Sequence, residues 1–510
     1  MMRFRMTPTP QPALPVERIL LAAGWLALAV FVAVGMERAL WLDEANSVLI
    51  AAHPPAGIVD ALSRDNNFPL YYFLLSAWMR LFGDSEIALR ALSALFYVAG
   101  CAPAYALGRR LAGGRAGWYS AFLYEVSPLA VRQAQNVRMY SLLGLLAGLA
   151  TLLFLRLFHD GDRSRRTSAL YVAVAAAGLL THAWFGFVVA AHLVALLACG
   201  RRHAARFALL AALAGVPFLA LWSRTFLEQL HNGATAWMPL RLGIFALAPV
   251  EFFGPLTALA IYTVAGIALV RAGAERRRQA LGGGGMAMTA VIFAASLALP
   301  LLVSLVKPIY WPGRYLIIAL PPLAAVLGAT LTALVGRAPL AAMGLLLLAL
   351  QVSAHVALRD AVPDAQLPPG QSDRVTAEFL LEHARPGDAI VFTSRTRAAA
   401  DYYFHRWGAA NRFVEMNYPA EVATHPGWSE TAIRPEGRPA LEAEAAATAA
   451  RLQRMASAGA TVWLYEGYAV AIGEILRQQL DGALLLRRAH ALEGPFHKRV
   501  EEFGPRPTAR

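Results

Sequence analysis

Two adjacent carboxylates, Asp43 and Glu44, follow the first apolar stretch of the chain. Carboxylates so close to hydrocarbon are costly to desolvate, so their presence calls for a reason. A structural reason is that acidic side chains in the first turn of a short helix complement its dipole. A chemical reason is that a carboxylate in a partly dry site can act as a general base. Neighbouring helical side chains point roughly 100° apart, so the two carboxylates need not act on the same atom. The chemical interpretation makes Asp43 the base and lets Glu44 orient Asp43 or an acceptor.

A second polar cluster occupies residues 64–72, at the start of a short apolar run. Pro69 is typical of the first turn of a helix, and Asp65 or Asn66 could simply cap that helix. The alternative is that the cluster binds a polar substrate. Its candidate binding residues are Asp65, Asn67, Tyr71 and Tyr72.

Two more clusters, at residues 132–140 and 307–315, combine basic residues with tyrosine. The predicted topology places both clusters outside the membrane, where arginine runs against the usual charge bias and could bind an anion. Snorkelling to lipid headgroups and an interfacial aromatic belt are the structural alternatives. Carboxylates in one outer loop, with arginine and tyrosine in two others, suit a phosphate-linked substrate whose leaving group is stabilised by arginine. The candidates here are Arg138, Tyr140, Tyr310, Arg314 and Tyr315.

Metal-binding signals are weak. No two histidines have metal-ligand spacing on one helix face. His182 lies at the outer end of an apolar stretch and is a further candidate for substrate binding. The two cysteines, Cys101 and Cys199, both lie in apolar segments, which excludes a disulfide framework and a cysteine metal cluster. The sequence names no certain cofactor and leaves a divalent metal open.

The composition indicates that membrane helices position these residues. Hydrophobic residues make up 57% of the 510-residue chain and charged residues 15%, against roughly 45–50% and about 25% in a typical soluble domain. A mean hydropathy of +0.47 excludes disordered, coiled-coil and ordinary cytosolic classes. The net charge of +13 comes from arginines clustered in short loops, which is typical of membrane topology and not of nucleic-acid binding.

Eleven apolar stretches predict membrane spans. A twelfth run, 69–82, is too short to span, and leaving it at the interface places the main arginine clusters in the cytoplasm. Tyr71, Tyr72 and Trp78 would then suit the lipid headgroup level. The N-terminus is predicted to be cytoplasmic, and the long loop 37–87 to lie outside. The predicted spans are 19–36, 88–107, 116–131, 139–155, 169–183, 185–199, 207–222, 255–270, 286–306, 315–335 and 340–358.

The tail has a different character. Helical patterns at 373–383 and 441–457 alternate with strand-like segments at 389–392 and 461–465, which is typical of a small α/β domain. The predicted organisation is a transmembrane domain, 1–358, which includes the loop 37–87, followed by an extracytoplasmic α/β domain, 359–510.

The order of these motifs resembles the GT-C membrane glycosyltransferases, and within them the bacterial relatives of protein O-mannosyltransferases and of the lipid A aminoarabinose transferase (glycosyltransferase family 39). The resemblance covers about residues 19–360. The motifs that carry it are Leu42-Asp43-Glu44, Asp65-x-Asn67-x-Pro69-Leu70-Tyr71-Tyr72, Phe82-Gly83 with Glu86 and Arg90, Gln135-x-x-Arg138-Met139-Tyr140, and Arg314-Tyr315 before a proline-containing span.

The resemblance implies an all-α polytopic membrane protein of GT-C fold with about eleven transmembrane helices, set in a bacterial inner membrane. Such enzymes transfer a sugar, with inversion, from a polyprenyl-phosphate donor to an extracytoplasmic lipid, glycan or protein. By the same resemblance, Asp43 corresponds to the catalytic acidic residue of the first outer loop, and Arg138 and Arg314 to positions that could hold the lipid phosphate.

Two other functions stay open. A lipid-linked saccharide transporter or flippase would tend to place charge at mid-membrane and to have related halves. A polymerase or ligase of surface polysaccharide would not need the ordered acidic and Arg-Met-Tyr motifs.

Overall fold

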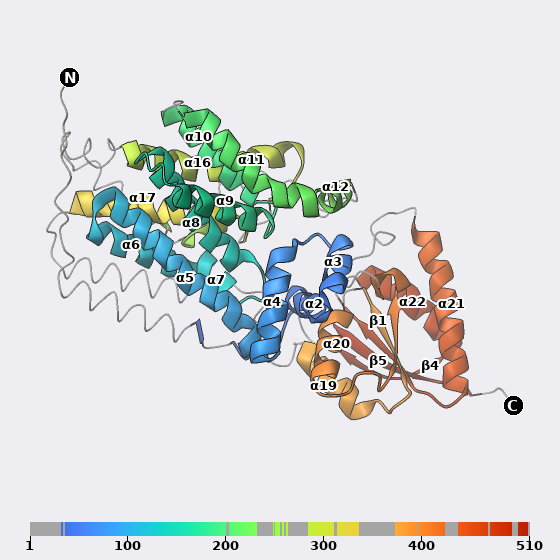
Figure 1. Ribbon diagram of the computed structural model, residues 1–510. Coiled ribbons are helices and arrows are strands. Elements are labelled where there is room, and N and C mark those ends of the chain that lie inside the picture. The colour runs from blue at the N-terminus through green and yellow to red at the C-terminus, as the bar shows by residue number, and fades with distance from the viewer. Residues whose placement is uncertain are drawn as a thin grey trace, which may run out of the picture. The chain divides into compact units, whose positions relative to one another are not determined.

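The computed structural model forms two compact units (Figure 1). The first contains Met1–Met36, Asn66–Leu74 and Ile87–Val362; the second contains Glu37–Asp65, Leu75–Glu86 and Pro363–Arg510. The acidic segment around Asp43 therefore groups with the C-terminal domain. The structure describes residues 32–33, 36–199, 203–231, 248, 250–255, 258–259, 262–263, 284–310, 314–335, 373–394, 396–423, 437–467, 470–491 and 498–507.

The first unit is helical. In its described part, five helical segments are long and apolar enough to cross a membrane: Glu86–Ala112, Tyr140–Phe158, Ala204–Leu221, Gly284–Val306 and Tyr315–Thr332. Its elements are α5 (Glu86–Ala112), α6 (Gly114–Glu125), α7 (Pro128–Ala134), α8 (Tyr140–Phe158), α9 (Arg165–Leu179), α10 (Phe185–Cys199), α11 (Ala204–Leu221), α12 (Ser223–His231), α16 (Gly284–Val306), η2 (Tyr315–Ala319) and α17 (Leu320–Val335).

Most predicted spans correspond to helices, with two differences. The predicted span 116–131 is two helices, because Pro128 disfavours helical backbone before it and the Ser127 side chain accepts from the amide of Ala130 to cap α7. The predicted span 169–183 ends as a helix at Leu179. The predicted spans 19–36 and 255–270 lie largely outside the described residues, and 340–358 wholly outside, so eleven spans stay a prediction.

Helix α4 (Pro69–Phe82) has the bounds predicted for the short apolar run. Tyr71 and Tyr72 are fully buried, and the hydroxyl of Tyr71 lies 3.2 Å from the Ser93 hydroxyl of α5. These two tyrosines therefore face the protein interior, and the expectation that they meet lipid headgroups is wrong.

Small residues let the helices of the first unit pack closely. Helix α6 packs on α17, and a β-carbon at Gly328 of α17 or at Gly108 of α5 would collide with Ser120 of α6. Glycine at such contacts is common between membrane helices, because close packing is a main source of their association.

The second unit contains a five-stranded sheet of order β2-β1-β3-β5-β4. Strand β1 pairs in parallel with β2 and β3, and β5 is antiparallel to β3 and β4. The predicted α/β tail is therefore present. Its elements are α19 (Asp373–His383), β1 (Ala389–Thr393), α20 (Arg397–Arg406), β2 (Val414–Tyr418), η4 (Ala420–Ala423), α21 (Arg438–Ser457), β3 (Val462–Glu466), α22 (Val470–Ala483), β4 (Leu485–Ala491) and β5 (Arg499–Gly504).

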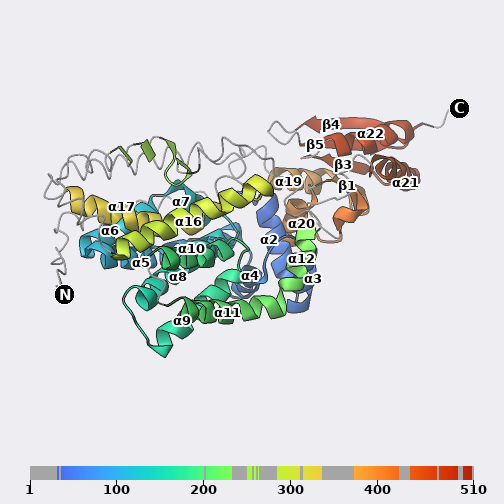
Figure 2. The ribbon, with the colours of Figure 1, turned by 90° about the horizontal axis from the view of Figure 1, so that it is seen from above.

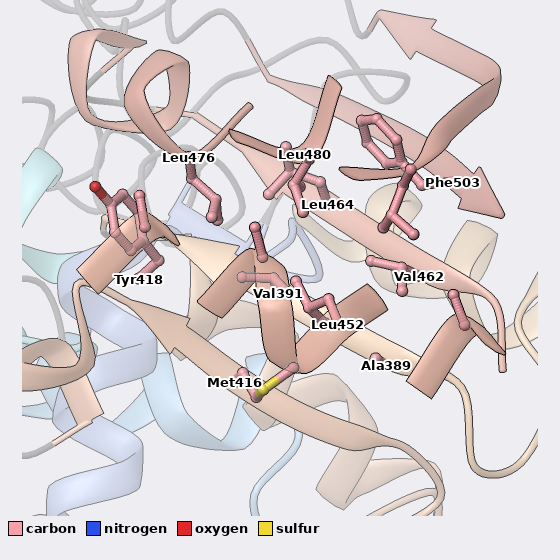
Figure 3. Packing of buried hydrophobic residues seen from close by; sticks show 14 residues of the cluster. Ala389, Val391, Met416, Tyr418, Leu452, Val462, Leu464, Leu476, Leu480 and Phe503 are labelled. Atoms are coloured by element: carbon pink, nitrogen blue, oxygen red, sulfur yellow. The ribbon is translucent and has the colours of Figure 1, made fainter. Parts of the chain in front are cut away.

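The core of this domain lies against the central strands. Every residue of β1 and of β3 is buried, as expected of central strands that are covered on both faces. Figure 3 shows Val391 and Leu464 of these strands packed with Leu452 of α21 and Leu480 of α22. Two further helices of the second unit, α2 (Leu42–Ala52) and α3 (Pro55–Ser63), come from the N-terminal segment, and α2 packs on α20.

Candidate functional site

Arg138 joins two of the predicted motifs. It lies in the turn between α7 and α8, and its side chain is buried, with 8% of the residue exposed. Its Nη2 donates to Asn67 Oδ1 at 3.0 Å, and its Nη1 donates to the Tyr72 hydroxyl at 3.4 Å. Asn67 and Tyr72 therefore orient the guanidinium. A guanidinium held in this way can bind a phosphate or carboxylate.

The turn that carries Arg138 is itself fixed by hydrogen bonds. The Ser93 hydroxyl of α5 donates to the carbonyl of Arg138 at 3.3 Å, and the Arg138 amide donates to the carbonyl of Asn136 at 2.7 Å. The side chain of Gln135 donates to the carbonyl of Val32 at 3.0 Å. The position of the guanidinium is therefore set by contacts with two other segments of the first unit.

A second group of predicted residues forms an aromatic cluster around His182. The imidazole centroid lies 5.9 Å from the Tyr140 ring and 5.4 Å from the Tyr315 ring. The Arg314 guanidinium lies 6.0 Å from the centroid of Tyr140 and 5.9 Å from that of Tyr315. Arginine against tyrosine faces is a cation–π arrangement that leaves the guanidinium edge able to donate hydrogen bonds.

His182 connects this cluster with Arg138. It lies in the turn after α9, and its Nδ1 accepts from the amide of Trp184 at 3.1 Å. Burial, together with the positive charges of Arg138 and Arg314, lowers the pKa of His182 to about 3. The imidazole is therefore neutral at physiological pH, with Nε2–H as its remaining donor. A strongly shifted pKa beside two arginines is typical of a functional site.

Tyr310 extends the cluster through Trp184. The ring centroids of Trp184 and Tyr310 are 6.2 Å apart, and Trp184 stacks on Tyr315 at 4.8 Å. Burial raises the pKa of the Tyr310 hydroxyl, and the neighbouring Glu251 carboxylate raises it as well. Tyr310 is thus a neutral hydroxyl at physiological pH.

The structure brings together nine of the predicted binding residues within the first unit. They come from four separate parts of the sequence, and their role in binding stays a prediction. They are Asn67, Tyr71, Tyr72, Arg138, Tyr140, His182, Tyr310, Arg314 and Tyr315.

Glu251 was not predicted. A serine–carbonyl hydrogen bond anchors its segment, because Ser127 Oγ donates to the carbonyl of Phe252 at 2.5 Å. The signal that singled out Asp43, a carboxylate beside a predicted span, also applied to Glu251, which comes shortly before the predicted span 255–270.

The predicted acidic residues Asp43, Glu44 and Asp65 belong to the second unit. Glu44 is fully buried, and its Oε2 accepts from the Trp41 amide at 3.3 Å. Glu44 therefore caps the start of α2, as the structural interpretation of the acidic pair expected. Asp43 is half-buried at the second position of α2, and Asp65 is half-buried just after α3.

The C-terminal domain holds the segment that leads to Asp43. The Leu40 amide donates to the Tyr403 hydroxyl of α20 at 2.9 Å, and Nη2 of Arg374 donates to the carbonyl of Glu37 at 2.8 Å. Both bonds fix backbone within a few residues of Asp43.

The second unit also holds the end of the long loop. Glu86 forms ion pairs with Arg374 and with Arg406, the latter at 3.5 Å. The hydroxyl of Tyr402 donates to the carbonyl of Asp84 at 2.8 Å. Residues of α19 and α20 therefore fix both ends of the predicted outer loop.

Metal ions in proteins are bound by groupings of histidine, cysteine, aspartate or glutamate side chains. Among the residues that the structure describes, no group of three histidine, cysteine, aspartate or glutamate side chains could hold a metal ion.

Comparison with known proteins agrees with this fold. Residues 66–223 match the sequence model of the family described as dolichyl-phosphate-mannose-protein mannosyltransferase. The crystal structure of ArnT from Cupriavidus metallidurans in the apo state is similar, with a TM-score of 0.59, 14% identity, and coverage of 94% of this chain and 98% of that one. For ArnT bound to undecaprenyl phosphate the TM-score is 0.61, the identity 14%, and the coverage 96% and 98%.

A more distant similarity is to the apo oligosaccharyltransferase of Archaeoglobus fulgidus, with a TM-score of 0.50, 11% identity, and coverage of 95% of this chain and 75% of that one. No curated protein matches the sequence. The fold is therefore similar to that of ArnT, and the segment 66–223 matches a mannosyltransferase family.

Proposed function

We propose that this protein transfers a sugar from a polyprenyl-phosphate donor to an extracytoplasmic lipid, glycan or protein, with inversion. One observation carries the proposal: the buried Arg138 guanidinium is oriented by Asn67 and Tyr72 and lies near a neutral His182 that also faces Arg314. Two guanidinium groups that both act on one imidazole suit the binding of a phosphate. The similarity to ArnT bound to undecaprenyl phosphate supports the same donor class.

In the proposed reaction, Asp43 takes the proton from the acceptor hydroxyl as its oxygen attacks the anomeric carbon. The bond between that carbon and the phosphate oxygen breaks, and the electron pair leaves with the polyprenyl phosphate. Arg138 and Arg314 stabilise the charge that develops on the leaving phosphate. Each charge-assisted hydrogen bond contributes about 1.5–3 kcal/mol. A single displacement of this kind inverts the anomeric configuration.

Glu44 has a smaller part in this proposal. Its carboxylate caps α2, so it orients Asp43 through the helix and not through the substrate. Asp65 stays a proposed binding residue. We place the reaction on the outer face of a bacterial inner membrane, in line with the predicted charge distribution.

The proposal is tested by incubating the purified full-length protein with a panel of radiolabelled polyprenyl-phosphate sugars and candidate acceptors, with and without chelator. We expect label to move from one donor to an acceptor with inverted anomeric configuration. Donor that binds tightly and is never cleaved, with every acceptor class supplied, would contradict the proposal and favour a carrier. Loss of transfer with chelator would add a divalent metal.

A further inference from the structure

A pocket of about 840 Å³ lies between α9 and α11, away from the candidate site. Figure 2 shows these two helices side by side. None of the predicted site residues lines the pocket. Its lining residues are of two kinds, basic or polar residues and apolar residues. They include the basic residues Arg163, Arg165 and Arg206 and the apolar residues Val172, Leu210 and Leu213.

The basic residues gather at one end of the pocket, where both helices begin. Nη1 of Arg206 donates to the carbonyl of Asp162 at 3.0 Å, and its Nη2 donates to Ser168 Oγ at 2.9 Å. These bonds place the first turn of α11 beside the first turn of α9. Helix N-termini carry partial positive charge, which adds to that of the arginines.

This end of the pocket has an excess of positive charge. Arg163 and Arg165 are exposed and form no ion pair within the described part of the chain. The nearest carboxylate in the loop, Asp162, is already engaged: it accepts from Thr167 Oγ1 at 2.7 Å and from the Ser164 amide at 2.8 Å. The hydrogen bond from Thr167 is the main reason why the pKa of Asp162 is lowered to about 2.

The rest of the pocket wall is apolar. Residues one to three turns further along both helices line it, among them Val172, Leu210 and Leu213, and Leu213 is 48% exposed. A soluble anion would make no favourable contact with this apolar wall, and a neutral lipid would make no ionic contact with the three arginines. Phosphate next to a hydrocarbon chain satisfies both parts.

We propose that this pocket binds an anionic membrane phospholipid, with the phosphate at Arg163, Arg165 and Arg206 and an acyl chain along Val172, Leu210 and Leu213. The proposal does not depend on the glycosyl transfer. In this proposal Arg206, which a hydrogen bond to Ser168 of α9 orients, is the central contact with the phosphate. The exposed arginines Arg163 and Arg165 add further ionic contacts with the headgroup.

The test is native mass spectrometry of the purified full-length protein, titrated with phosphatidylglycerol or phosphatidylcholine of identical acyl chains. We expect the wild type to retain phosphatidylglycerol at lower lipid concentration. The Arg165→Gln/Arg206→Gln double variant should lose about fivefold in affinity per arginine removed. Arg163→Gln/Arg165→Gln, which touches no ion pair among the described residues, covers the case in which the Arg206 variant does not fold.

The matched control is Arg224→Gln. Arg224 is an exposed arginine that pairs with Glu228 on α12 and does not line the pocket. This variant should retain phosphatidylglycerol like the wild type. Equal retention of both lipids, or retention of phosphatidylglycerol that is unchanged in the variants of the pocket arginines, would overturn the proposal. So would a preference of the pocket for undecaprenyl phosphate over phosphatidylglycerol that these same arginines control.

Discussion

The Tyr403 hydroxyl accepts a hydrogen bond from the backbone amide of Leu40 at 2.9 Å, in the buried interior of the second unit. Leu40 stands two residues before the first residue of α2, the helix that carries Asp43. Burial is the main reason why the pKa of Tyr403 is raised to about 12, so the hydroxyl keeps its proton at physiological pH. The C-terminal domain therefore fixes the backbone that enters the acidic helix.

Tyr403→Phe should lower both stability and turnover. The variant leaves the buried Leu40 amide without its acceptor, which costs about 1–3 kcal/mol in the free energy of unfolding. Because the freed backbone leads to Asp43, kcat should fall while KM for the donor is unchanged. The measurement is steady-state transfer together with thermal unfolding.

The neighbouring residue gives a matched control for that variant. Tyr402→Phe also removes one hydroxyl from α20, but this hydroxyl binds the carbonyl of Asp84 and not the segment before α2. We expect some loss of stability with kcat retained. If the two variants lowered kcat equally, Tyr403 would have only a general structural role.

Glu86→Gln should destabilise the second unit. The Glu86 side chain is only 10% exposed and pairs with both Arg374 and Arg406. Replacing a charged hydrogen-bond partner should lower the free energy of unfolding by about 1.5–3 kcal/mol, as measured by denaturant unfolding of the full chain. The control is Glu442→Gln, whose pair with Arg438 is half-exposed and should be worth about 0.3–0.5 kcal/mol. Equal effects would mean that the Glu86 ion pairs add nothing.

Arg138→Gln should weaken donor binding. One or more charge-assisted hydrogen bonds to phosphate, each about 1.5–3 kcal/mol, correspond to a loss of about tenfold to 150-fold in affinity. The readout is the equilibrium binding of a labelled polyprenyl-phosphate donor. Arg224→Gln is the control, since Arg224 pairs with Glu228 on the exposed face of α12. An unchanged affinity in the Arg138 variant would remove Arg138 from the phosphate site.

His182 predicts how stability depends on pH. The pKa of His182 is about 3 in the folded protein against about 6.5 for a free imidazole. Between these values the unfolded chain binds a proton that the folded chain does not, so stability present above about pH 6.5 is lost as the pH falls towards 3. His182→Gln should flatten this part of the curve of Tm against pH. His405→Gln, at an exposed position of α20, should keep the slope of the wild type. The same slope in the His182 variant would contradict the assignment.

Local signals predicted the helices well. The bounds of α4, α10 and α19 agree with the prediction. Apolar runs define α4 and α10, and a helical pattern followed by the turn Arg385-Pro386-Gly387 defines α19. The break between α6 and α7 was missed although Ser127-Pro128 signals it. The predicted topology placed the arginine and tyrosine motifs on one side of the membrane. The structure brings nine of the candidate residues together within the first unit.

Long-range contacts could not be predicted in the same way. Leu40 and Tyr403 are 363 residues apart in sequence, and no periodic pattern connects them. Charge bias assigns a loop to a side of the membrane, but it does not say which domain a loop packs against. For that reason the loop 37–87 was assigned to the transmembrane domain, whereas the contacts group most of it with the α/β domain.

The most direct test of the account compares sugar transfer by the wild type, Asp43→Asn and Asp60→Asn. Asp60 is an exposed aspartate of α3 that pairs with Arg64, so its variant controls for the loss of one carboxylate in the same segment. We predict that the wild type and Asp60→Asn transfer label, whereas Asp43→Asn binds the donor with unchanged affinity and transfers none. Transfer at the wild-type rate by a folded Asp43→Asn protein would contradict the account.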